Sequence, residues 1–293
     1  DDKEIPETPE TTVANITTTK SSVGIRNGQQ LEQGATLHEF DVIEYTLTAT
    51  NSGNGEGSVV ISDKVPEGTT LVPGSIKLDG TGSYDEDDLN NGITVLVATT
   101  PRRVTFKVIV NKLTEAEVHI KNEVAKQDGT TITPGTDDKI EKEYVTVTAN
   151  KNFVDNNGVD GKRPASVELE LYADGKTTGK TATTDANWKV EFTQLDKYTE
   201  AGKLIKYSVK ENNVNEYYKD TYSTPEVEGN HTTIKVTNTL KYEMIKKSVE
   251  ATKVWDDGDN KAGVRPDSVE FELYADNATT NKTQTVSKVE DSN

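Results

Sequence analysis

The sequence repeats part of itself at a constant spacing. The segment KVWDD, followed by RPDSVEFELYAD, runs from Lys253 to Asp276, and KNFVD, followed by RPASVELELYAD, runs from Lys151 to Asp174. Lysine, arginine, proline, serine, tyrosine and aspartate all recur exactly 102 positions later. A repeat as long as one domain indicates an array of whole domains rather than a fine solenoid.

The length of 293 residues also fits two or three domains of roughly 100 residues each. The first dozen residues are acidic and rich in proline, threonine and glutamate, a composition that cannot bury enough apolar surface to order itself. We therefore predict a flexible linker at 1–12, a first domain at 13–142, a complete repeat at 143–242 and an incomplete second copy at 243–293.

Alternating apolar and polar residues predict half-buried strands throughout. In the complete repeat Val167, Leu169 and Leu171 alternate with glutamates, and Asp174-Gly175 supplies a hairpin turn. Further short strands are expected upstream, at 41–51, 59–65, 103–110 and 118–124. The predicted fold class is all-β, with tandem immunoglobulin-like β-sandwich domains in an elongated rod and very little helix.

Charge and composition exclude several functions. The formal net charge of -17 leaves no basic patch for nucleic acid and disfavours contact with an anionic membrane. The chain has no cysteine, so disulfides and thiolate sites are excluded. Its N-terminus is unlike a signal peptide, and we expect any export signal or anchor to lie outside these residues.

Three polar residues of the complete repeat stand in phase with core-facing neighbours. Lys151, Glu211 and Asn238 share the strand phase of apolar residues, which for the lysine are Val145, Val147, Ala149 and Phe153. Burying an ammonium group is unfavourable unless it is paired, neutralised or consumed. On spacing alone, a salt bridge with an asparagine hydrogen bond, or a lysine that reaches the solvent at a strand end, remains an equal alternative.

Several motifs of the segment 144–242 resemble the B-type repeat of collagen adhesins and Gram-positive pilins (Cna B-type). They are Lys151, DGKRP at 160–164, LYADG at 171–175, Trp188, LDKY at 195–198, YSVKE at 207–211 and VTNT at 236–239. In that family a first-strand lysine and a last-strand asparagine form an isopeptide bond assisted by a glutamate. The resemblance implies that Lys151 and Asn238 are joined, with Glu211 as the assisting acid.

Such a bond has a simple physical basis. Burial lowers the pKa of an amine, which becomes neutral and nucleophilic, and raises the pKa of a carboxylic acid, which can then polarise the carboxamide. Folding supplies the proximity, and a dry core keeps water from competing. The reaction is a single turnover, so the chain is not expected to be a conventional enzyme.

The first domain holds a parallel set of residues. Lys20, Asp63 and Asn122 are each in phase with apolar neighbours. YTLTATNSG at 45–53, SDKVPEG at 62–68 and KNEV at 121–124 are similar to conserved-repeat surface domains (domain of unknown function eleven) and to pilin domains that use aspartate as the assisting acid. The resemblance implies a Lys20–Asn122 bond beside Asp63.

The incomplete copy contains the pattern Val249, Ala251, Lys253, Trp255, which predicts a third reactive strand. The repeat spacing places its acid near 313 and its acceptor near 340, beyond the printed sequence. We therefore expect Lys253 to be an unpaired reactive lysine here, in a module that continues beyond residue 293 or accepts a strand from another molecule.

Other candidate motifs carry less chemistry. GKTTGKT at 175–181 has three residues between its glycines where a phosphate loop needs four. The acidic loop at 79–92 could bind calcium, although its spacing fits no known calcium loop and a solvated turn is favoured. The three histidines are scattered, so no metal site and no cofactor are expected.

Two functional classes follow, with a hydrolase as a remote third because no convergent pocket is visible in the sequence. The first is a structural stalk on a bacterial surface, extracellular and anchored to the cell wall, whose partners are other domains of the same protein. The second makes the first domain an adhesin module that binds a host-matrix or cell-surface ligand. A deep groove or an exposed apolar patch on 13–140 would favour the second class.

Overall fold

The computed structural model describes residues 12–287, so the linker expected at 1–12 lies almost entirely outside the described residues. Strands make up 52% of the chain and helices 4%, which confirms the all-β prediction. Two compact units are present, Asp1–Leu240 and Lys241–Asn293. The first unit contains the two domains called here the first and second domain.

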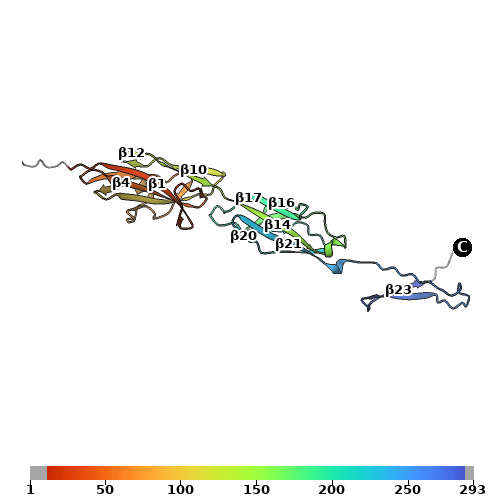
Figure 1. The fold of residues 1–293 in the computed structure, drawn as a ribbon. Helices are drawn as coiled ribbons and strands as arrows, with labels where there is room; N and C mark the ends of the chain where they lie inside the picture. Colours follow the sequence, from red (N-terminus) through yellow and green to blue (C-terminus); the bar gives the residue numbers. More distant parts are fainter. Residues whose placement is uncertain (1–11, 288–293) are drawn as a thin grey trace, which may run out of the picture. The chain divides into compact units, whose positions relative to one another are not determined.

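The first domain is built from three sheets (Figure 1). In one sheet the strand order is β2-β1-β4-β9-β6, with β7 also pairing with β9; the other two are β10-β13-β3 and β12-β11-β5-β8. The bounds are β1 Ile16–Arg26, β2 Gln29–Gln30, β3 Leu37–His38, β4 Val42–Asn51, β5 Gly57–Ser62, β6 Thr69–Leu71, β7 Lys77–Leu78, β8 Ile93–Val97, β9 Arg102–Val110, β10 Glu117–Asn122, β11 Lys126–Gln127, β12 Thr130–Thr131 and β13 Thr136–Glu141.

Period-two alternation decides which side chains enter this core. In β4, Ile43, Tyr45, Leu47 and Ala49 are fully buried, while the residues between them are partly exposed. Strand β9 contributes Phe106, whose ring centroid lies 5.0 Å from that of Tyr45. Lys20 is directly opposite Leu47 in the register between β1 and β4, so its side chain enters the core.

The second domain consists of two sheets that face each other (Figure 1). The larger has the strand order β17-β14-β21-β19, with β20 beside β21, and the smaller has the order β16-β15-β18. The bounds are β14 Tyr144–Val154, η1 Asn156–Gly158, β15 Glu168–Ala173, β16 Lys176–Thr183, β17 Lys189–Asp196, β18 Tyr207–Glu211, β19 Tyr218–Tyr222, β20 Glu226–Glu228, β21 His231–Leu240 and, just after it, η2 Tyr242–Met244. Residues from both sheets form one apolar core.

First and last strands of this domain, β14 and β21, lie side by side in parallel. Lys151 is opposite Val236, and Phe153 is opposite Asn238. Because residues two apart share a face, all four side chains point toward the smaller sheet.

Among its described residues, the second unit contains one hairpin, β22 Ser268–Ala275 paired with β23 Ala278–Ser287. The strand predicted from Val249 to Trp255 is wrong: these residues have no regular structure, and Val249 is 70% exposed. The pattern alone is not sufficient, because β14, its counterpart in the second domain, is held by β17 and β21 on either side. The position equivalent to β21 falls outside the printed sequence.

Helix is confined to short pieces. The α-helix α1, Glu86–Asn91, is capped by Asp85, which accepts a hydrogen bond from the Asp88 backbone, and it buries Leu89. Within residues 12–287, no helix is long and apolar enough to cross a membrane.

Candidate cross-linking sites

The three polar residues predicted in the second domain meet in its core. Lys151 comes from β14, Glu211 ends β18 in the opposite sheet, and Asn238 lies on β21. The Lys151 Nζ atom is 2.7 Å from Glu211 Oε2, and the Asn238 Nδ2 atom donates to Glu211 Oε1 at 2.9 Å. One carboxylate therefore contacts the amine and the carboxamide at the same time.

Burial sets the chemistry of this group. The side chains of Lys151 and Glu211 are 0% and 3% exposed, and Asn238 is fully buried. Burial lowers the pKa of Lys151, and its hydrogen bond and ion pair with Glu211 only partly oppose this. The Asn238 Oδ1 atom is buried and has no hydrogen-bond partner in the structure, so the oxygen that an acid would polarise is unoccupied by competing donors.

The first domain assembles an equivalent group from different elements. Lys20 lies in β1, Asp63 directly follows β5, and Asn122 ends β10. The Lys20 Nζ atom is 2.8 Å from Asp63 Oδ2, with both side chains fully buried, and the Asn122 Nδ2 atom donates to the same oxygen at 3.4 Å. Lys20 also donates to the backbone carbonyl of Asn122 at 3.1 Å.

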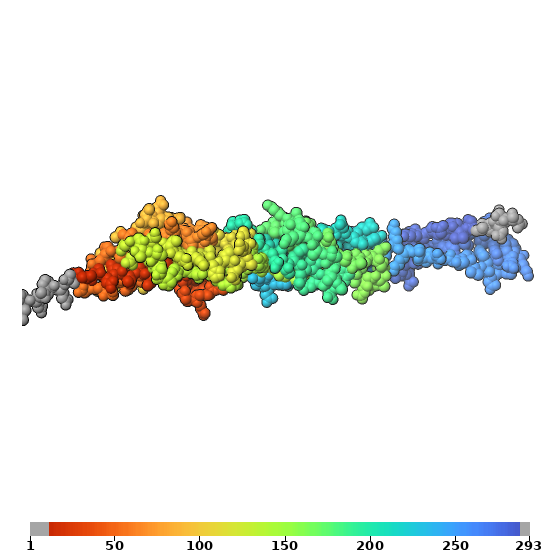
Figure 2. Space-filling model, turned by 90° about the horizontal axis from the view of Figure 1, so that it is seen from above, coloured from red at the N-terminus to blue at the C-terminus, as the bar shows by residue number. Residues whose placement is uncertain are grey.

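Burial is again the dominant electrostatic effect. It lowers the pKa of Lys20 and raises the pKa of Asp63, in each case against the attraction between the two groups. The Asn122 Oδ1 atom is buried without a hydrogen-bond partner, like its counterpart in the second domain. In the space-filling view of Figure 2 the surface of the first domain is coloured from red through orange to yellow.

Comparison with known proteins agrees with the repeat. Residues 147–239 and 249–293 match the model of the Cna protein B-type domain. These two stretches are similar to Cna B-type domains. A collagen adhesin of Staphylococcus aureus is 40% identical over 166 residues, which cover 56% of this chain and 13% of that protein. The residues matched by the family model do not include the first domain.

Solved structures similar to this chain include a single B repeat unit of the collagen-binding surface protein of Staphylococcus aureus, at 24% identity, 63% coverage of this chain, 98% coverage of that chain and a TM-score of 0.28. The major pilin subunit of Bacillus cereus is 13% identical, with 78% and 71% coverage and a TM-score of 0.36. The family match and the collagen adhesin relative support a role at the cell surface related to stalks and adhesins.

A second polar cluster of the complete Cna B-type domain was missed by sequence reasoning. Asp155 is 1% exposed and accepts hydrogen bonds from both Arg163 Nε, at 2.8 Å, and Arg163 Nη2. The Tyr218 hydroxyl donates to it at 2.9 Å. These hydrogen bonds, that of Arg163 above all, lower the pKa of Asp155. The Arg163 Cζ atom lies 5.0 Å from the Phe153 ring, beside the reactive lysine.

The sequence did contain a signal for this cluster. The spacing from Asp155 to Arg163 recurs from Asp257 to Arg265, and that pair also forms a two-nitrogen contact. Arg265 lowers the pKa of Asp257 to about 2. In the same unit Lys253 is exposed, with its Nζ atom 4.6 Å from the Trp255 ring.

The remaining sequence candidates have structural roles. GKTTGKT forms the turn and first residues of β16. Part of the acidic loop at 79–92 forms α1 and its cap, and no group of three or more potential metal ligands occurs in residues 12–287.

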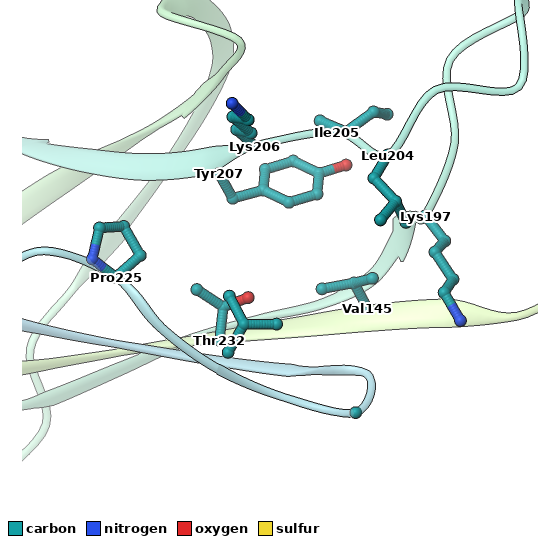
Figure 3. A pocket seen from close by; sticks show the side chains of 10 residues that line it. Val145, Lys197, Leu204, Ile205, Lys206, Tyr207, Pro225 and Thr232 are labelled. Atoms are coloured by element: carbon teal, nitrogen blue, oxygen red, sulfur yellow. The ribbon is translucent and has the colours of Figure 1, made fainter.

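One apolar cavity of about 440 Å³ lies in the complete Cna B-type domain (Figure 3). Val145, Leu204, Ile205 and Tyr207 are among its lining residues. Val145 precedes Lys151 by six residues along β14, a separation of roughly 20 Å in an extended strand. The cavity is therefore separate from the cross-linking site.

Proposed function

We propose that this chain is a stalk or adhesin segment of a bacterial cell-surface protein, stabilised by autocatalytic Lys–Asn isopeptide bonds. The observation that carries the proposal is the recurrence of one buried arrangement in two domains. In each, a single carboxylate contacts both a lysine amine and an asparagine carboxamide. The two arrangements use different acids from different places in the fold.

The reaction in the second domain begins with transfer of a proton from Lys151 to Glu211, which leaves a neutral amine and a neutral acid. The carboxamide then turns so that the acid donates to its oxygen, and the amine attacks the side-chain carbon of Asn238. A nitrogen–carbon bond forms, the original carbon–nitrogen bond breaks, and one ammonia leaves with a proton shuttled by Glu211. In the first domain Lys20, Asp63 and Asn122 take the same roles.

A simple ion pair explains these groups less well. Removing two charges from water is unfavourable, and a buried pair often stabilises a fold no more than apolar residues of the same volume. Burial lowers the pKa of Lys151 and Lys20 despite the adjacent carboxylate, which supports a neutral amine at both sites. A neutral amine beside a carboxamide, shielded from water, favours reaction.

Intact-mass measurement of the full chain tests the proposal. We expect the loss of two molecules of ammonia, one from each complete domain, and none from Lys253. Glu211→Ala should lose only the ammonia of the first domain, and Asp63→Ala only that of the second, because each lacks its proton shuttle.

Lys235→Ala provides the control, because this exposed residue lies on β21 and its side chain points away from the core. It should retain both losses. Fragmentation of tryptic peptides should locate the bonds at Lys151–Asn238 and Lys20–Asn122. A wild-type chain that is folded but keeps its full mass would refute cross-linking.

For the surface role, we propose an extracellular location, anchorage to the cell wall and association mainly with other domains of the same protein. The apolar cavity lies outside 13–140, whereas a more open hollow of about 360 Å³ lined by Ile16, Gln127 and Ile132 lies on the first domain and is the candidate surface for the alternative of a ligand-binding first domain. Because one relative is a collagen adhesin, immobilised collagen is the direct probe of that alternative. Saturable binding by the full chain that is abolished by substitutions on 13–140 would favour an adhesin module.

A further inference from the structure

The first-domain site contains a second carboxyl group that the proposed reaction does not use. Asp138 lies on β13, opposite Ile120 of β10, the strand that ends at Asn122. Its side chain faces β1 and β4. The Ser22 hydroxyl donates to Asp138 Oδ1 at 2.8 Å, and the Tyr45 hydroxyl donates to Oδ2 at 3.4 Å.

Both donors connect Asp138 to the reactive lysine. Ser22 is two residues after Lys20 on the same face of β1. Tyr45 is fully buried, and its ring centroid lies 5.4 Å from the Lys20 Nζ atom. Asp138, Tyr45 and Lys20 therefore form one continuous group, which Lys20 connects to Asp63.

The charges in this group oppose one another. A negative Asp138 raises the pKa of Lys20 and so counteracts the effect of burial. Burial in turn raises the pKa of Asp138, and repulsion from Asp137 acts in the same direction, while Ser22, Tyr45 and Lys20 lower it. With both Asp63 and Asp138 ionised, one ammonium faces two carboxylates, and the buried group has an excess negative charge.

We propose that Asp138 is a positioning residue that controls when Lys20 becomes a nucleophile. Ionised Asp138 holds Lys20 as an ammonium ion and slows bond formation, whereas protonated Asp138 lets Lys20 pass its proton to Asp63. The inference rests on the proposed Lys20–Asn122 reaction and adds its dependence on pH.

The proton balance is closed with water as the only external donor and acceptor. One proton from the solvent neutralises Asp138, and the ammonium proton of Lys20 moves to Asp63. The amine then bonds to the side-chain carbon of Asn122, and ammonia leaves with the second amine proton. Asp63 and Asp138 afterwards release their protons to water.

The second domain differs in this respect. The opposite charges of Lys151 and Glu211 cancel, and the proton passes from one to the other. Their reaction therefore needs no proton from solvent. Asp220 also raises the pKa of Lys151, but its 2.6 Å hydrogen bond from Tyr222 is exposed to solvent. Solvent screening weakens the effect of such a charge.

Time-resolved refolding of the full chain tests the inference, with the second domain as an internal reference. The chain is purified unfolded from inclusion bodies and diluted at several pH values, and the two cross-linked peptides are quantified by mass spectrometry. Since the protonated fraction of Asp138 falls by up to about tenfold per pH unit once the pH exceeds its raised pKa, we expect the Lys20–Asn122 rate to fall as the pH rises from ~5.5 to ~7.5, by up to about tenfold per unit. The Lys151–Asn238 rate should change less than about twofold.

Asp138→Asn should remove this dependence and make the first-domain bond form several-fold faster than in wild type at pH ~7.5. Asp138→Glu should restore it. Asp220→Asn is the matched control and should leave both profiles unchanged. A purely structural role for Asp138 would instead slow the reaction by the same factor at every pH.

A flat wild-type profile, or an Asp138→Asn profile parallel to that of wild type, would overturn the inference. Complete absence of the Lys20–Asn122 peptide from folded wild type would instead refute the proposed reaction. If Asp138→Asn does not fold, Tyr45→Phe gives the same test, because it removes a donor that stabilises ionised Asp138. Its profile should then move to higher pH, and an unchanged profile counts against the inference.

Discussion

The first and second domains reach the same arrangement of amine, acid and carboxamide by different routes. In the second domain the acid is the last residue of a strand in the sheet opposite Lys151. In the first domain it directly follows β5, and its backbone is held by a hydrogen bond to Leu89 of α1. The site is therefore defined by where the three side chains meet.

The largest expected effect is loss of a cross-link. Each bond would close a loop of about 90 to 100 residues, for which the chain-entropy model suggests on the order of 4 kcal/mol. Asn238→Ala should therefore lower the melting temperature of the second domain by roughly 15–30 °C, and Asn122→Ala should do the same to the first. Scanning calorimetry of the full chain measures both transitions.

Thr239→Ala is the control for this comparison, because Thr239 is exposed and adjacent to Asn238 on β21. It should shift neither transition by more than a few degrees. If Asn122→Ala leaves the first transition in place while Asn238→Ala lowers the second, only the second domain is covalently tied.

A smaller effect is expected at the Asp155 cluster, which has a counterpart in the second unit. Arg163→Ala leaves Asp155 buried without its main partner, and removing a charged partner of this kind costs about 1–3 kcal/mol. The second-domain melting temperature should fall accordingly. Arg265→Ala, at the equivalent exposed pair, should change the circular dichroism spectrum and its thermal transition little.

The two domains should also respond differently to mild acid when they are not cross-linked. The raised pKa of Asp63 means that its contribution to stability is present below its ordinary value of 3.8 and is lost as the pH rises through the folded value. Lowering the pH from neutral toward about 4.5 should thus stabilise the first domain of Asn122→Ala. Folded and unfolded pKa values that differ by one correspond to about 1.4 kcal/mol of this stabilisation.

The lowered pKa values of the lysines give stability that is present above 10.5 and is lost as the pH falls through their folded values. The pKa of Asp155 is lowered, so its contribution to stability is present above pH 3.8 and is lost only when the pH falls below that value. Calorimetry of Asn238→Ala should therefore show no comparable gain at pH ~4.5. Asp63→Asn in the Asn122→Ala background should leave only the part of the gain due to Asp138.

Sequence patterns predicted the regular parts of this molecule because a strand's alternation directly states which side chains are buried. Ile43, Tyr45 and Leu47 illustrate this, and the same rule placed Lys151, Glu211 and Asn238 toward one core. Whether their atoms would touch could not be read from phase, because distances depend on sheet packing. Asp138 was missed although Ile140 shares its strand phase, because Asp137 and Lys139 on either side give the segment the look of a solvated charged strand.

Patterns failed where pairing partners decide the structure. Val249 to Trp255 alternates as well as β14 does, yet it forms no strand in the described residues. A strand requires neighbouring strands for its backbone hydrogen bonds, and these are long-range contacts that a local window does not contain. Trp188 precedes β17 with a φ of 59°, and its ring packs on that of Phe153.

The smallest expected effect concerns the turns of the two equivalent hairpins. Asp174-Gly175 in the second domain and Asp276-Asn277 in the second unit both have positive φ at both positions, as a two-residue type I′ turn requires. Glycine adopts this conformation without strain, and asparagine tolerates it better than other residues with a side chain. Nothing lies within 4 Å of a Cβ atom added at Gly175. Gly175→Asn should therefore change the free energy of unfolding by less than about 1 kcal/mol, whereas Gly175→Val, with a branched side chain in the left-handed region, should cost about 1–2 kcal/mol. Calorimetry of the second-domain transition in an Asn238→Ala background, where no cross-link masks small changes, distinguishes the two, and equal melting temperatures for both variants would contradict the turn assignment.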